Sequence, residues 1–382
     1  MSTSLVRNGL LIVALGFLAT ACGGGSGDSN AGTGSTSATS SASASGSSGS
    51  NSSGSTSGSG TSSGSGTSGS SGTTTSSGSS SGSGSSGGSG STSGSGGSGT
   101  SSGGTSGSSG SGTAVMPKSA KRGVAFNLMD PADFLALSPG VSWWYDWGAQ
   151  PDAAAPTDFL TAYQMDFYPM IWGAQYNVNA VETYLLAHTN IKYLLVMNEP
   201  NLTGQSNLTP QQAAALWPDF EAISVKTGVK IVGPQITWGT MANYNDPIQW
   251  LDAFYAAFEA ANNGAQPQID YLGFHWYDYG LAGQLDRLAT KYGKPFWVTE
   301  FANWHSQNDG AEITTLAQQE AQMADMVNTC ETRSDVFRYA WFSGRVNPDP
   351  HFSSLLGTSP GQLTGLGQKY LSLPYTTAFT GT

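Results

Sequence analysis

The chain has 382 residues and a formal net charge of -11, and its composition changes abruptly along its length. Residues 23–112 are almost entirely Ser, Gly and Thr, with Asp28 as their sole charge, so this stretch cannot bury enough apolar surface to offset its ordering entropy and is predicted to be a disordered linker. The remaining ~270 residues suffice for one folded domain. Because that domain is acidic, nucleic acid and anionic membrane surfaces are excluded as partners.

The N-terminus has the layout of an export signal. Arg7 precedes an apolar run over residues 10–18 and the small residues 19–21, which is typical of a secretory signal peptide. Cys22 follows directly and resembles the cysteine of a bacterial lipobox, although the leucine stands one position early, at Leu18. We predict an exported outer-membrane or cell-surface lipoprotein, whose membrane contact is a lipid on Cys22. Cleavage before an unlipidated Cys22 would instead release a secreted protein.

Three segments are therefore expected: a signal peptide over residues 1–22, a linker over 23–115 and a catalytic domain over 116–382. Within the domain, short apolar and aromatic runs alternate with longer helical stretches, which is typical of repeated βα units. The predicted strands cover residues 123–127, 141–147, 166–172, 193–199, 230–236, 271–277, 295–301 and 336–342. The predicted helices cover residues 178–187, 210–226, 248–262, 281–292 and 313–332.

Eight strands in this alternation favour a single (β/α)₈ barrel over an open doubly wound sheet. No Gly-rich dinucleotide fingerprint follows the first strand, which weakens the open-sheet alternative further. In a barrel of this kind, the chemistry lies at the carboxyl ends of the strands. Polar residues that end strands are therefore the candidates for the site.

Two carboxylates end apolar strands. Glu199 closes the fourth predicted strand, in the string Val-Met-Asn-Glu-Pro, and Glu300 closes the seventh, in Trp-Val-Thr-Glu-Phe. A closed barrel can point both into one cleft, and a carboxyl pair flanking a cleft is what cleavage of a glycosidic bond requires. Either glutamate taken singly could instead form a salt bridge or cap a helix.

Other chemistries find less support in the sequence. His275, His305 and His351 lack the short spacings of zinc motifs, and no cysteine cluster accompanies them. The domain contains no Gly-x-Ser-x-Gly elbow between a strand and a helix. We therefore predict neither a metal nor another cofactor.

The strings around these strands resemble one enzyme family. Asn198–Asn201 and Thr299–Phe301, together with Lys121–Gly123, Trp143–Trp147 and His275–Tyr277, are similar to glycoside hydrolase family 128, whose members are retaining endo-β-1,3-glucanases with a (β/α)₈ fold. The resemblance covers residues 121–371 and none of the linker. It implies that Glu199 is the proton donor and Glu300 the nucleophile.

The resemblance also implies a substrate-binding set. Asn198 would hold the 2-hydroxyl of the sugar, and Tyr277 would donate a hydrogen bond to Glu300, unless it caps the barrel core instead. Because sugar faces stack on indole rings, tryptophans near strand ends are further candidates. At most one of two successive strand residues can face the barrel interior. The predicted substrate-binding residues are Asn198, His275, Tyr277, Trp143, Trp144, Trp172 and Trp341.

The expected function is thus endo-hydrolysis of β-1,3-glucan by a monomer. Two alternatives stay open at this point. One is a retaining hydrolase of another β-linked polysaccharide, such as mannan or mixed-linkage glucan. The other is a non-catalytic glucan-binding surface lipoprotein, which the presence of both carboxylates disfavours.

Overall fold

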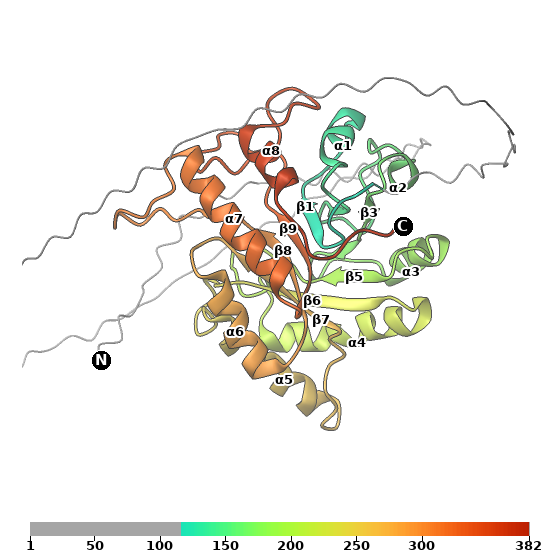
Figure 1. Cartoon of the computed structure of the whole chain (residues 1–382). Helices are drawn as coiled ribbons and strands as arrows, with labels where there is room; N and C mark the ends of the chain where they lie inside the picture. Colours follow the sequence, from blue (N-terminus) through green and yellow to red (C-terminus); the bar gives the residue numbers. More distant parts are fainter. Residues whose placement is uncertain (1–115, 382) are drawn as a thin grey trace, which may run out of the picture. The chain divides into compact units, whose positions relative to one another are not determined.

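The computed structural model describes residues 116–381, so the predicted signal peptide, Cys22 and the linker lie outside the described residues. The strands are β1 (Arg122–Ala125), β2 (Trp143–Tyr145), β3 (Asp166–Phe167), β4 (Met170–Ile171), β5 (Tyr193–Val196), β6 (Lys230–Ile236), β7 (Tyr271–Trp276), β8 (Phe296–Phe301) and β9 (Val336–Trp341). The helices are α1 (Pro131–Leu137), α2 (Phe159–Ala162), α3 (Val178–Ala187), α4 (Pro210–Thr227), α5 (Pro247–Ala261), α6 (Leu281–Tyr292), α7 (Leu316–Thr332) and α8 (Gly365–Ser372). Figure 1 shows these helices outside the strands.

All strand pairs are parallel, in the order β3-β2-β1-β9-β8-β7-β6-β5-β4. The strands β3 and β4 are two halves of the single strand predicted over residues 166–172, interrupted at Tyr168 and Pro169. The first half pairs with β2 and the second with β5. Together β3 and β4 therefore occupy one strand position, and the sheet curls into a barrel of eight strands. The predicted (β/α)₈ fold is confirmed.

Most predicted elements are found within a few residues of their expected bounds. The strand over 230–236 and the helices over 178–187 and 281–292 match those predicted. Helix α4 begins as its sequence predicts, because Thr209 accepts from the backbone N–H of Gln212 in a capping box and Pro210 takes the first turn. The sequence did not indicate α1, α2 or α8, which have 7, 4 and 8 residues and too few turns for a clear periodic pattern.

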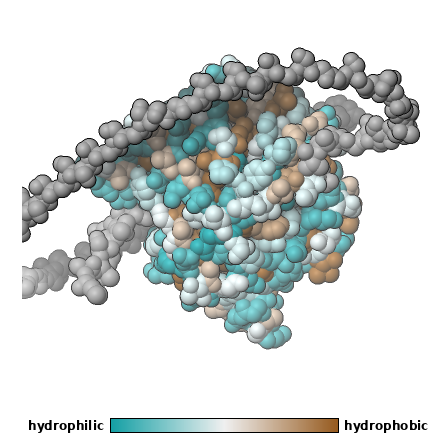
Figure 2. Space-filling view, in the orientation of Figure 1, coloured by the Kyte–Doolittle hydropathy of each residue, from teal (hydrophilic) through white to brown (hydrophobic). Residues whose placement is uncertain are grey.

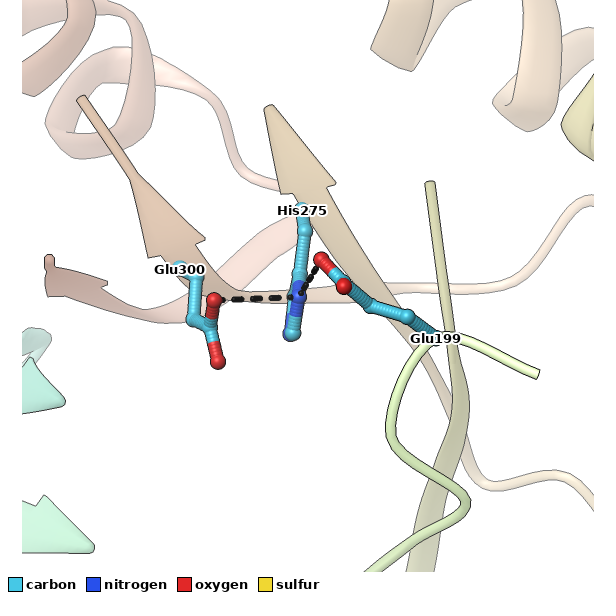
Figure 3. Close-up of side chains that lie close together, drawn as sticks. All are labelled: Glu199, His275 and Glu300. Atoms are coloured by element: carbon cyan, nitrogen blue, oxygen red, sulfur yellow. Dashed lines mark hydrogen bonds and ion pairs between the residues drawn. The ribbon is translucent and has the colours of Figure 1, made fainter. Parts of the chain in front are cut away.

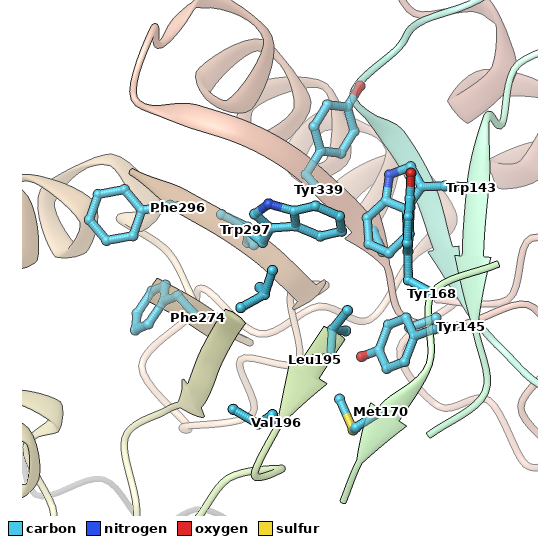
Figure 4. Close-up of a cluster of buried hydrophobic side chains, with 14 of the residues drawn as sticks. Trp143, Tyr145, Tyr168, Met170, Leu195, Val196, Phe274, Phe296, Trp297 and Tyr339 are labelled. Carbon is cyan, nitrogen blue, oxygen red and sulfur yellow. The ribbon is translucent and has the colours of Figure 1, made fainter. Parts of the chain in front are cut away.

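The barrel interior is filled by aromatic side chains, which Figure 4 shows around Trp297. The rings of Trp143 and Trp297 lie 5.1 Å apart. Gly123 on β1 makes room for this packing, since a Cβ there would lie 2.3 Å from the Trp143 ring. Trp144 faces the opposite way and packs against Phe134 of α1, with ring centroids 5.2 Å apart. One tryptophan of the pair therefore faces the interior, as strand alternation predicts.

A buried polar network joins the first strand to the last part of the chain. Arg122 is 1% exposed, and its guanidinium donates to the carbonyls of Tyr370 and Leu373, each at 2.8 Å. Its Nε donates to the hydroxyl of Tyr339 on β9, and that hydroxyl donates in turn to Glu331 on α7. Arg122, in the Lys-Arg-Gly string at the start of the domain, thus links β1 to β9 and to the segment around the end of α8. We call this junction of the first and last strands the seam of the barrel.

Lys118 likewise links separate backbone segments, here at the amino ends of the strands. Its ammonium group is buried and donates to the carbonyls of Ser138, Val141, Tyr163 and Gln164 at 2.7–3.2 Å. These carbonyls shortly precede β2 and β3. The described chain therefore enters the domain at the amino ends of the strands, the end opposite to the one where Glu300 lies.

Candidate active site

Glu199 and Glu300 meet at the carboxyl ends of β5 and β8. Glu199 lies three residues beyond the end of β5, and Glu300 is the second-to-last residue of β8, directly before Phe301. Both side chains are almost fully enclosed, with 5% and 4% exposed. Figure 3 shows their carboxylates pointing toward each other from opposite sides of His275, which comes from β7.

The distances between these groups are short. His275 Nδ1 lies 2.8 Å from Glu199 Oε1 and 3.3 Å from Glu300 Oε2. An oxygen of each carboxylate and a ring nitrogen of His275 all lie within 4.8 Å of one another. A separation of this size suits a retaining glycosidase, whose two carboxyl groups stand about 5–5.5 Å apart, rather than an inverting one, which needs about 6.5–9.5 Å.

Glu300 is surrounded by hydrogen-bond donors. Its Oε1 accepts from the hydroxyl of Tyr145 at 3.0 Å and from Nε1 of Trp147 at 2.8 Å, and its Oε2 accepts from the hydroxyl of Tyr277. Donors on a carboxylate stabilise its ionised form. Burial and the charge of Glu300 raise the pKa of Tyr145 and of Tyr277, so both hydroxyls keep their protons.

Glu199 has a different environment. Burial raises its pKa, and the charge of Glu300 raises it further, whereas the hydrogen bond and charge of His275 lower it; the net direction is upward. A carboxyl with a raised pKa holds a proton at higher pH than usual. The surroundings therefore suit Glu199 to donate a proton, whereas Glu300 accepts hydrogen bonds from three neutral donors.

The backbone at Glu199 is held in an uncommon conformation. Its φ is +43°, in the left-handed region, and its N–H donates to the carbonyl of Gln235 on β6 at 2.9 Å. Non-glycine residues in this region cost conformational energy and tend to occur at functional sites.

Three of the predicted substrate-binding residues lie beside the carboxylates or the mouth. Tyr277 donates to Glu300, the contact predicted for it. Asn198 is 3% exposed, its Nδ2 donates to Gln205, and its Oδ1 has no hydrogen-bond partner among the described residues. Trp172 is 40% exposed at the end of β4 and lines a cavity of about 200 Å³ together with Trp147.

The other four predicted substrate-binding residues are corrected by the structure. Trp143, Trp144, Trp341 and His275 each have 0% of their surface exposed, so none is available to a sugar. Trp143 lies in the barrel interior, and Trp144 lies on the outer face of the strands, where the helices cover it. Trp341 contacts Phe301 and α8, with Nε1 donating to the carbonyl of Ser353. His275 lies beneath the two carboxylates and bonds them instead.

Tyr145 and Trp147 are site residues that the sequence interpretation missed. Both donate to Glu300 Oε1. The sequence did offer a signal, because alternate side chains of a strand point to the same face. Since Trp143 faces the barrel interior, Tyr145 and Trp147 lie on the same face, closer to the mouth. Trp147 has a φ of +64°, which the sequence did not indicate.

Glu199, His275 and Glu300 are also the cluster within residues 116–381 whose donor atoms could hold a metal ion. Two carboxylates and an imidazole are ligands that divalent metals accept. However, Tyr145, Trp147 and Tyr277 already place hydrogen atoms on both oxygens of Glu300. This donor set fits proton transfer better than metal binding.

Comparisons with known proteins agree with this chemistry. Residues 123–370 match a family model described as glycosyl hydrolase catalytic core. The chain is similar to the crystal structure of a GH128 subgroup II endo-β-1,3-glucanase from Pseudomonas viridiflava, with 60% identity and a TM-score of 0.67, over 68% of this chain and 100% of that one. It is also similar to a GH128 subgroup I endo-β-1,3-glucanase from Amycolatopsis mediterranei in complex with laminaritriose, with 26% identity and a TM-score of 0.50, over 66% of this chain and 98% of that one.

A curated relative is alkali-sensitive linkage protein 1 of Schizosaccharomyces pombe, which is 24% identical over 265 residues. The match covers 66% of this chain and 45% of the relative, so the chain spans less than half the length of that protein.

Proposed function

We propose that this chain, which belongs to the glycosyl hydrolase catalytic core family and to glycoside hydrolase family 128, is an endo-acting β-1,3-glucanase that retains anomeric configuration. The observation that carries the proposal is the meeting of two buried carboxylates, Glu199 and Glu300, with oxygens within 4.8 Å of each other at the mouth of a barrel.

In the first step, an oxygen of Glu300 attacks the anomeric carbon while the glycosidic C–O bond breaks. Glu199 gives its proton to the leaving oxygen, and the raised pKa of Glu199 supports that role. The product is a covalent glycosyl ester of Glu300, with Glu199 now ionised.

In the second step, Glu199 takes a proton from a water molecule, and the water oxygen attacks the same carbon and displaces Glu300. Two inversions give net retention. The three donors on Glu300 stabilise it as the leaving carboxylate in this step.

The substrate assignment is supported by two relatives, an endo-β-1,3-glucanase that shares 60% identity and another that was crystallised with laminaritriose. Trp172 offers a half-exposed indole face beside the mouth, which suits the apolar face of a glucose unit. Asn198 supplies an acceptor without a protein partner next to Glu199, which supports its proposed contact with a sugar hydroxyl.

The test is Glu300→Gln assayed on laminarin, with products resolved by chromatography and the anomer first formed identified by NMR. Wild type should release the β-anomer from internal cleavage, and Glu300→Gln should lose at least about 10³-fold in kcat while still binding oligosaccharide. Glu320→Gln on the outer helix α7 is the matched control and should be unaffected. Initial release of the α-anomer would contradict retention, and preferred cleavage of mannan or mixed-linkage glucan would contradict the substrate.

Export and lipid attachment at Cys22 also belong to the proposal and rest on the sequence of residues 1–22. Among the described residues, no helix is long and apolar enough to cross a membrane. The full chain should partition with membranes in cell fractionation, and Cys22→Ala should move the activity out of the membrane fraction. Equal partitioning of both proteins would contradict the lipid anchor.

A further inference from the structure

The two buried carboxylates share a single basic neighbour. Within residues 116–381, neither Glu199 nor Glu300 has a lysine or arginine within 4 Å, and His275 is the ion-pair partner of both. Leaving negative charge buried without a counter-charge is costly. The protonation of His275 therefore determines the charge balance of the site.

One ring nitrogen of His275 is fixed by a chain of hydrogen bonds. Gln235 Nε2 lies 2.7 Å from the carbonyl of Val232, which can only accept, so the amide oxygen of Gln235 faces Thr299. The hydroxyl of Thr299 has one hydrogen, and it goes to that oxygen. Thr299 Oγ1 must then accept from His275 Nε2, 3.0 Å away, so Nε2 carries a proton.

The barrel is built to hold this chain of bonds. Gln235, Thr299 and His275 are all 0% exposed, so water does not compete for their hydrogen bonds. Gly273 on β7 makes the room, since a Cβ there would lie 2.1 Å from the amide oxygen of Gln235. Gln235 also holds the backbone of Glu199 through its own carbonyl.

The other ring nitrogen, Nδ1, faces Glu199 Oε1 at 2.8 Å and Glu300 Oε2 at 3.3 Å. An unprotonated Nδ1 would direct its lone pair toward two carboxylates, whereas a protonated one donates to them. The remaining groups on Glu300 are the neutral donors Tyr145, Trp147 and Tyr277. Burial lowers the pKa of His275, but Glu300 and Glu199 raise it by more, so the net direction is upward.

On the basis of the proposed retaining mechanism, we propose that His275 remains an imidazolium throughout the catalytic cycle. Its Nδ1–H then donates to whichever of the two carboxylates carries the negative charge. Before the first step the negative charge is on Glu300, and after it the charge is on Glu199, because one has formed an ester and the other has lost its proton. The pair carries one negative charge in both states. A cation in contact with both balances that charge without moving, which makes His275 a positioning residue.

The protonation state can be measured without substrate. Protein labelled with ¹⁵N at its four histidines would be examined by long-range ¹H–¹⁵N NMR, with the signals of His275 identified by their loss in His275→Gln. Both ring nitrogens of His275 should stay protonated between about pH 5 and pH 8, a range in which an ordinary histidine side chain loses a proton. A ring nitrogen without a proton at a pH where the enzyme is active would overturn the proposal.

Substitutions at Thr299 test the chain of hydrogen bonds. Thr299→Val leaves His275 Nε2–H without an acceptor, so kcat/KM should fall about 10- to 100-fold, chiefly through kcat, and His275 should lose a proton at lower pH. Thr299→Ser keeps the hydroxyl and should restore both properties. Thr237→Val is the matched control, because Thr237 donates to the backbone carbonyl of His275 and not to its ring.

The outcomes separate the two proposals. An active wild type with a neutral His275, or a Thr299→Val variant whose NMR titration and pH profile are unchanged, would refute the imidazolium while leaving the glucanase function intact. A protonated His275 in a protein that does not cleave β-1,3-glucan would refute the proposed function alone.

Discussion

Glu199 and Glu300 are the same amino acid at nearly the same exposure, yet their neighbours fit them for different tasks. Tyr145, Trp147 and Tyr277 place three donors on Glu300, whereas the side chain of Glu199 has His275 as its partner among the described residues. Hydrogen bonds favour the anion at one site, and burial favours the acid at the other. The proposed assignment of Glu300 as nucleophile and Glu199 as proton donor rests on this asymmetry.

The pH dependence of the reaction should report the environment of Glu199. The first step needs this carboxyl protonated, so kcat/KM falls as pH rises through its pKa. Because that pKa is raised, the descending limb should lie above the pH range of an ordinary glutamate, near 4.3 in model peptides. Kinetics on laminarin between about pH 4 and pH 9 provide the measurement. A limb at the ordinary glutamate value would contradict the role of burial.

On an activated aryl laminarioside, whose leaving group needs little protonation, Glu199→Gln should retain most of the rate of formation of the covalent intermediate. On laminarin the same variant should lose about 10²- to 10⁴-fold. Equal losses on both substrates would count against Glu199 as the acid.

At the scale of elements, two buried cationic side chains link segments of the barrel. Lys118 lies at the amino ends of the strands, and Arg122 lies where β1 pairs with β9. Lys118 bonds four carbonyls that precede β2 and β3, and Arg122 bonds the carbonyl of Tyr370 in the last turn of α8 and that of Leu373 just after it. Most of these carbonyls are buried, where a backbone group without a hydrogen-bond partner is costly.

Replacing Lys118 by Met should lower the free energy of unfolding by about 3–5 kcal/mol, because three buried carbonyls and one partly buried carbonyl lose their donor. Lys294→Met is the matched control, since Lys294 bonds one carbonyl, that of Ile269, and should cost about 1 kcal/mol or less. Chemical denaturation of both variants gives the comparison. Equal stability of the two would show that Lys118 does not hold the segments together.

The elements were largely predictable from sequence, because eight apolar strands and long periodic helices give strong local patterns. Short helices such as α2, with 4 residues and no buried side chain, leave too weak a signal. At the site, Glu199 and Glu300 could be found as strand ends. The burial of Trp341 and His275 could not, because it depends on which segments fold over the strand ends, and a single strand pattern does not carry that information.

At the scale of the whole molecule, the acidic chain divides into a Ser/Gly-rich part and a folded domain. The face shown in Figure 2 carries mostly hydrophilic and intermediate residues, with hydrophobic ones scattered among them. Lys118 and Arg122 bond partners within the described residues 116–381, so these contacts do not depend on the Ser/Gly-rich part.

Removal of residues 1–113 should therefore leave the melting temperature and the kcat/KM on soluble laminarin unchanged. A longer deletion, through Arg122, removes Lys118 and the seam arginine and should prevent folding. Circular dichroism and laminarin hydrolysis of the two truncated proteins check this expectation. Unfolding of the shorter truncation would contradict the domain boundary at residue 116.

The described chain enters the domain at the end of the barrel opposite the candidate active site. Lys118 fixes that point at the amino ends of the strands, and the backbone of Phe379 bonds Lys118 there as well. Glu199 and Glu300 lie at the opposite end of the barrel, at the carboxyl ends of the strands. A polypeptide joined to the domain at Met116 would thus attach at the end of the barrel away from Glu199 and Glu300, and the catalytic mouth would stay open to a glucan chain.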